Sequence, residues 1–209
     1  MEFDLTRSLY FLPGIILGLT VHEFCHAYVA KLCGDTTSEE QGRITLNPLK
    51  HIDPMGFIFL LIVGFGWAKP VQFDERNLRN PKHDVMKIAI AGPLSNAAIA
   101  MILSLILSDL PTHQSDTYQI IGNIIYYAII INWALFVFNL IPLPPLDGSH
   151  LLFNGLRKYP TLHYNLYKYG SFVFIGLILA TILTKINFLP IWPVIRFFAD
   201  GFFSLIGFS

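Results

Sequence analysis

The sequence predicts an all-α polytopic membrane protein. Apolar residues make up 54% of the 209 residues, whereas Asp, Glu, Lys and Arg together make up 13%, about half the share usual in a soluble domain. Three apolar segments are also long enough to cross a bilayer as helices. We expect these three helices to form a core with one or two C-terminal helices added. A small membrane-edge β-sheet and a re-entrant segment are expected between the first two core helices.

The balance of charges excludes two classes of protein. Lys plus Arg number 14 and Asp plus Glu number 14, so the formal net charge is zero. A chain this apolar is not a disordered one. A nucleic-acid binder that relies on a basic surface is excluded as well.

The predicted spans follow one another along the chain. The first, Leu9–Leu32, has 24 residues and would measure about 36 Å as a helix. The second and third are expected at residues 85–110 and 120–141, and a shorter fourth at residues 172–186. The tail after residue 188 is apolar but broken by prolines and charges, so it could be a kinked fifth span or an interfacial helix.

The connection between the first two spans has its own pattern. Residues 54–67 are apolar and rich in glycine but too few to span a bilayer, which predicts a re-entrant segment. Residues 43–46 and 71–73 alternate in polarity and predict short strands at the membrane edge. His51 and Lys69 are expected at the membrane interface.

The positions of Lys and Arg predict the orientation of the chain. Eight of them fall between residues 31 and 87, and none lies in the connection at residues 108–118. Three more, Arg157, Lys158 and Lys168, follow the third span. By the positive-inside rule, the long connection and the region after the third span face the cytoplasm.

Three polar residues interrupt the first span in the order His22-Glu23-Phe-Cys-His26. On a helix, positions i and i+4 share a face, so both imidazoles can reach one metal ion, with Glu23 placed as a general base. The alternative is two histidines with ordinary hydrogen bonds and a stray glutamate. Charged groups in a membrane span cost about 2.5 kcal/mol or more each, which favours the metal site.

Two histidines do not complete a catalytic zinc site, which usually has three protein ligands. The candidates for the third are Asp109, Asp116, Asp147, His51, His113, His150 and His163. Asp147 lies at the cytoplasmic end of the third span. His26 lies near the cytoplasmic end of the first span, so the two residues are expected on the same side of the membrane. Prolines before Asp147 stop the helix, and Gly148 permits a tight turn. Asp147 is therefore the predicted third ligand.

Three motifs together resemble the site-2 protease family of intramembrane zinc metalloproteases: HEFCH in the first span, AGPLSN in the second and NLIPLPPLDG after the third. NPLKHIDPMG and GWAKPV resemble the short bacterial branch of that family. The resemblance covers roughly residues 10 to 155. The segment before the second core span leaves no room for the PDZ domain that many members insert there.

The resemblance implies roles for individual residues. His22, His26 and Asp147 would bind one Zn²⁺ per chain, and Glu23 would be the general base. Asn96, the last residue of AGPLSN, would hold the substrate or the oxyanion, and a neutral amide donor suits that role. The alternative for Asn96 is a hydrogen bond between helices.

The resemblance also implies an activity and a place in the cell. The enzyme would hydrolyse a peptide bond within or near the transmembrane segment of a single-span membrane protein, in the bacterial inner membrane, with its active site towards the cytoplasm. Residues 1–155 would form the protease core and residues 156–209 C-terminal transmembrane or interfacial helices. Thr45 and Gln72, on the predicted strands, would bind an unwound substrate by edge pairing. The bilayer is the other expected partner, nucleic acid is not one, and the oligomeric state is open.

Two other functions fit parts of the pattern. A catalytically silent zinc scaffold of the same fold would keep the ligands, but the retention of Glu23 beside them favours an enzyme. A transporter would use the polar residues as an ion path. Transporters usually show paired half-repeats, which this sequence lacks.

Overall fold

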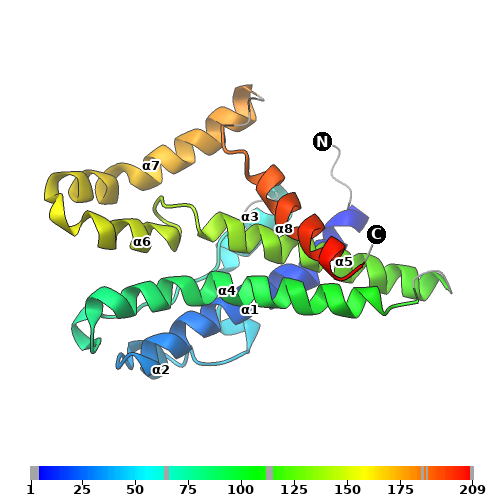
Figure 1. The fold of residues 1–209 in the computed structure, drawn as a ribbon, viewed down its shortest axis with the longest axis horizontal. Helices are drawn as coiled ribbons and strands as arrows, with labels where there is room; N and C mark the ends of the chain where they lie inside the picture. Colours follow the sequence, from blue (N-terminus) through cyan, green and yellow to red (C-terminus); the bar gives the residue numbers. More distant parts are fainter. Residues whose placement is uncertain (1–4, 64–65, 112–114, 185, 187, 208–209) are drawn as a thin grey trace.

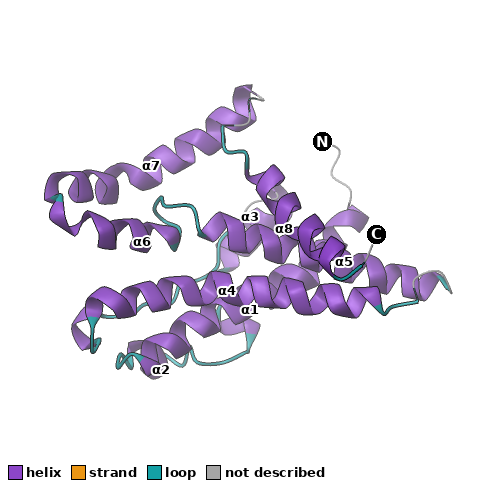
Figure 2. Ribbon diagram, viewed as in Figure 1, coloured by secondary structure: helices purple, strands orange, loops and turns teal. Residues whose placement is uncertain are grey.

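The computed structural model describes residues 5–63, 66–111, 115–184, 186 and 188–207. These residues form helices and loops, with no strand among them (Figure 2). The α-helices are α1 (Leu5–Leu32), α2 (Thr37–Glu40), α3 (Pro54–Val63), α4 (Pro81–Ser108), α5 (Asp116–Asn139), α6 (Gly148–Gly155), α7 (Pro160–Thr184) and α8 (Ile191–Leu205). Short 3-10 turns lie at η1 (Pro48–Lys50), η2 (Glu75–Asn77) and η3 (Leu156–Lys158).

Helices α1, α4 and α5 form the core of the protein. Each contacts the other two; α4 and α5 run along the long axis of the molecule, and α1 crosses them obliquely (Figure 1). In the described part of the chain, these are the three helices long and apolar enough to cross a membrane. The predicted all-α fold with a three-helix core is therefore confirmed, and its three long apolar helices are consistent with a polytopic membrane protein.

The C-terminal helix α8 packs across α4 and α5. It buries Ile195, Ala199 and Phe203 against apolar side chains of those two helices, while Trp192 and Phe197 are exposed. The Trp133 and Phe198 rings stack with centroids 5.3 Å apart. The broken apolar pattern of the tail thus encodes an amphipathic helix that covers the core.

Helix α7 covers residues 172–184 of the predicted fourth span but begins earlier, at Pro160, and ends at Thr184. It meets the end of α5 through the rings of Phe138 and Phe174, whose centroids are 5.4 Å apart. Gly170 adjoins Pro144, and a Cβ there would come within 2.7 Å of the proline ring. Residue 185, within the predicted span, lies outside the described residues.

The predicted membrane-edge sheet is wrong in the part of the chain that the structure describes. Residues 43–46 and 71–73 are loops, because their backbone groups bond elsewhere. The Arg43 N–H donates to the Ser38 carbonyl, and the Val71 N–H donates to the Glu23 carboxylate. The Gln72 carbonyl accepts from the Ser38 hydroxyl at 2.6 Å. One isolated antiparallel bridge joins Ile52 and Ala68 instead.

The predicted re-entrant segment lies between Ile52 and Ala68, and these two residues lie next to each other. Its helix α3 begins after Asp53, whose carboxylate accepts the Gly56 N–H at 2.9 Å. The bridge between Ile52 and Ala68 closes the segment at its base. Residues 64–65, at its far end, lie outside the described residues. Its depth in a bilayer stays a prediction.

Close packing between α1 and α5 depends on Gly14. A Cβ there would stand 2.5 Å from the Ala128 Cα, a backbone atom that cannot move independently. We therefore expect Gly14→Ala to lower the free energy of unfolding by about 1–3 kcal/mol through overpacking. Thermal unfolding in detergent measures this as a lower Tm.

Gly176, on α7, is the matched control because a Cβ there meets nothing within 4 Å. Gly176→Ala should leave the Tm unchanged or raise it, since alanine favours a helix over glycine by about 1 kcal/mol. An equal Tm for both variants would contradict the tight α1–α5 contact.

Candidate metal centre

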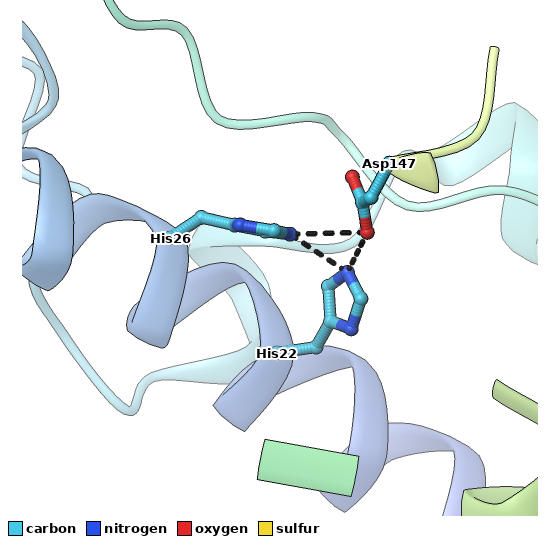
Figure 3. Close-up of side chains that lie close together, drawn as sticks. All are labelled: His22, His26 and Asp147. Atoms are coloured by element: carbon cyan, nitrogen blue, oxygen red, sulfur yellow. Dashed lines mark hydrogen bonds and ion pairs between the residues drawn. The ribbon is translucent and has the colours of Figure 1, made fainter. Parts of the chain in front are cut away.

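Three side chains from two distant parts of the sequence point toward one another (Figure 3). His22 and His26 lie one turn apart on α1, and Asp147 comes from the loop before α6. Nε2 of His22 lies 2.9 Å from Nε2 of His26. Oδ2 of Asp147 lies 3.0 Å from the first nitrogen and 3.3 Å from the second. The two predicted histidine ligands and the predicted carboxylate are therefore brought together.

The far side of each ring has its own hydrogen-bond partner. Nδ1 of His26 lies 2.7 Å from the Ile88 carbonyl oxygen, which can only accept. Nδ1 of His22 lies 2.7 Å from Oδ1 of Asn96. A neutral imidazole that donates from Nδ1 has a lone pair on Nε2. Both Nε2 atoms therefore present lone pairs towards the carboxylate of Asp147.

This arrangement fits a zinc ion. Three atoms that can each offer a lone pair to a metal converge, and Oδ2 of Asp147 is buried without a hydrogen-bond partner. Zinc bonds of about 2.0–2.2 Å at tetrahedral angles separate neighbouring ligand atoms by about 3.3–3.6 Å. The observed separations of 2.9–3.3 Å are close to that spacing. Two imidazoles and one carboxylate also match the ligand set of catalytic zinc, with one position left open.

Local sequence explains how Asp147 reaches the histidines. Helix α5 ends at Asn139, and the proline-rich loop that follows turns back sharply at Gly148. A Cβ on Gly148 would lie 2.5 Å from the Leu140 carbonyl oxygen, so only glycine allows this approach. Asp147 precedes α6 without capping it, which leaves its carboxylate available.

Glu23 is buried next to His22, and residues of the connection between α1 and α4 hold its carboxylate in place. Its Oε2 accepts the Val71 N–H at 2.8 Å and lies 3.9 Å from Nη2 of Arg43. Arg43 is itself buried, at 4% exposure, and donates to the Lys69 carbonyl. Burial lowers the pKa of Arg43, and the negative charge of Glu23 opposes that shift. Together these contacts hold the loop at residues 69–71 against Glu23, the candidate general base.

His51 lies next to this loop and supports it. Lys69 is exposed, whereas His51 is fully buried, and the place of both at the membrane interface stays a prediction. Nε2 of His51 donates to the Thr45 carbonyl oxygen at 2.7 Å, and burial lowers the pKa of this histidine. Thr45 and Gln72 thus lie in loops rather than in strands, so the predicted strands are wrong, whereas substrate binding by these two residues stays a prediction.

The other candidate ligands that the structure describes do not join the centre. Within the described residues, His22, His26 and Asp147 form the one group of metal-ligating side chains close enough to share an ion. His150 instead faces the Phe73 ring, with centroids 5.8 Å apart. His113 lies outside the described residues.

Gly92 also shapes the centre, as do two residues that were missed from the sequence, Asn132 and Arg43. A Cβ on Gly92 would come within 2.3 Å of Nε2 of His26, so α4 can pass the two rings only as glycine. Asn132 is fully buried and bonded to Asn96, and an amide inside an apolar span was a usable signal for it. Arg43 belongs to the alternating run at residues 43–46, and that pattern predicts a strand rather than a buried contact with Glu23.

The sequence is similar to one known protein over nearly its whole length and to others over about two thirds of it. A protein of Bacillus subtilis named "Putative zinc metalloprotease YwhC" is 35% identical over 98% of this chain and 94% of its own. "Putative zinc metalloprotease Rip2" of Mycolicibacterium smegmatis is 29% identical over 66% of this chain and 53% of its own. "Putative zinc metalloprotease MJ0611" of Methanocaldococcus jannaschii is 28% identical over 72% of this chain and 73% of its own.

The family model described as Peptidase family M50 matches residues 108–169, which include Asp147 and the whole of α5. No solved structure matches the chain. The full-length relative, the family match and the three converging ligands agree with the resemblance in the motifs. The chain therefore belongs to peptidase family M50, the site-2 protease family of zinc metalloproteases.

Proposed function

We propose that the chain is an intramembrane zinc metalloendopeptidase. It would hydrolyse a peptide bond within or near the transmembrane segment of a single-span membrane protein. The observation that carries this proposal is the His22–His26–Asp147 centre, built on membrane-spanning helices with Glu23 buried beside it. A soluble substrate has no need of a centre placed between apolar helices.

The residues have distinct roles in this proposal. His22, His26 and Asp147 would hold one zinc ion per chain. When bound, zinc supplies a Lewis acid that polarises the scissile carbonyl and lowers the pKa of water. Glu23 would take a proton from the attacking water and pass it to the leaving amine. The Val71 N–H and Arg43 would hold the Glu23 carboxylate in position for that transfer.

The contacts of Asn96 favour the hydrogen-bonding role over the oxyanion role. Its Oδ1 meets His22, and its Nδ2 donates to the Gly18 carbonyl at 3.1 Å and to Oδ1 of Asn132 at 3.0 Å. Both amide hydrogens are therefore engaged within the protein, and none is left for a substrate oxygen. We assign Asn96 the role of orienting His22.

The distribution of Lys and Arg supports an active site towards the cytoplasm. The bacterial inner membrane is the proposed location, and the single-span substrate and the bilayer are the proposed partners. The loop at residues 69–71, which covers Glu23, is the part of the centre that comes from the basic, cytoplasmic connection.

Zinc content tests the ligand set. We expect purified wild-type protein to carry one zinc per chain by elemental analysis and Asp147→Ala to lose it, because two imidazoles alone bind zinc weakly. Asp116→Ala is the matched control, since Asp116 is an exposed residue at the start of α5. Zinc retained in Asp147→Ala, or lost equally in Asp116→Ala, would contradict the assignment.

Glu23→Gln tests hydrolysis separately from metal binding. In proteoliposomes that contain a single-span reporter, we expect this variant to keep its zinc but to lose about 10²–10⁴-fold in cleavage rate, because the amide cannot accept the proton. Removal of zinc by a chelator should stop the wild type, and added zinc should restore it. A catalytically silent scaffold would show the same low rate in both proteins, and a transporter would show ion flux instead.

A further inference from the structure

We propose that Asn132, on α5, is a positioning residue for the metal centre. Acting through Asn96, it fixes which ring nitrogen of His22 carries the hydrogen and so keeps Nε2 of His22 free for the metal. The inference rests on the part of the proposed function that gives the site a metal, and it does not depend on hydrolysis.

The hydrogen bonds of Asn132 begin at two backbone carbonyls. Its Nδ2 donates to the Ala128 carbonyl at 2.8 Å and to the Gly14 carbonyl at 3.3 Å. A backbone carbonyl accepts hydrogen bonds and cannot donate them. The amide group of Asn132 must therefore turn its nitrogen towards these carbonyls and its Oδ1 towards Asn96, where it accepts at 3.0 Å.

The orientation of the Asn96 amide is fixed in the same way. Its Nδ2 faces Oδ1 of Asn132 and the Gly18 carbonyl, two oxygens that can only accept. Its Oδ1 must then face Nδ1 of His22, 2.7 Å away. That nitrogen is forced to be the donor. Nε2 of His22 consequently holds the lone pair that points to Asp147 and His26.

Reversal of the amides would disable the ligand. An Asn96 side chain turned the other way would present its nitrogen to Nδ1 of His22, and the ring hydrogen would move to Nε2. That hydrogen would then point at the place where the metal binds. Metal-ligating histidines generally have such a partner on the second nitrogen, and its loss costs about 10–100-fold in metal affinity.

Burial keeps the two amide groups in these orientations. Asn96 and Asn132 are both 0% exposed, and His22 is 4% exposed, so water does not compete for these bonds. Gly18 permits the approach, because a Cβ there would lie 2.7 Å from Oδ1 of Asn132. The series of bonds also joins α1, α4 and α5, so the position of one ligand is set by all three core helices.

Zinc affinity, measured by competition with a chromophoric chelator, tests the role of Asn132. We expect Asn132→Leu to bind zinc about 10-fold more weakly than the wild type. Asn132→Asp should stay within about threefold, because its protonated carboxyl keeps an acceptor for Asn96 and a donor for the Ala128 carbonyl. Ser104→Ala is the control: it removes a buried hydrogen bond within α4 to the Ala100 carbonyl and should leave zinc affinity unchanged.

A second measurement needs no variant of Asn132. In zinc-free wild-type protein labelled with ¹⁵N-histidine, long-range ¹H–¹⁵N spectra should show the His22 hydrogen on Nδ1. The hydrogen on Nε2, or equal zinc affinity in Asn132→Leu and the wild type, would overturn the inference. A wild type that binds zinc but cleaves nothing would defeat the proposed protease and leave this test intact, whereas a wild type that binds no zinc would defeat both.

Discussion

The convergence of Nε2 of His22, Nε2 of His26 and Oδ2 of Asp147 is the constraint on which the rest of the structure depends. Three atoms with lone pairs within 2.9–3.3 Å of one another repel unless a proton or a metal cation lies between them. The helical spacing of the two histidines supplies one side of the site. The break after α5 supplies the other, because a continuous helix would carry Asp147 away from α1.

Apolar helices can contain such a centre only if its polar groups are bonded inside the bundle. The hydrogen bonds of Asn96 and Asn132 meet this need between the helices, and the Val71 N–H meets it for Glu23. Small residues make these contacts possible. Gly92 gives room to the two imidazoles, and Gly18 lets α1 approach the asparagine on α5.

The sequence could predict the parts of the site that follow local periodicity. His22 and His26 lie at i and i+4 of an apolar helix, and the prolines and glycine around Asp147 mark where the next helix must stop. Local periodicity could not show that the predicted sheet is absent. Alternation at residues 71–73 does not reveal that the Val71 N–H donates to the carboxylate of Glu23, 48 positions earlier. Arg43 and His51 were likewise beyond reach, since their burial depends on how the loop folds onto α1.

Cleavage of membrane segments is the central claim, and comparative membrane proteomics tests it most directly. Cells that carry the wild-type chain would be compared with cells that carry Glu23→Gln at equal expression, with terminal peptides quantified. The account predicts that short single-span fragments accumulate with Glu23→Gln and are cleared by the wild type, which would also name the substrates. If fragments of known single-span proteins persist equally in both cell lines, although the wild type carries its zinc, the account is contradicted.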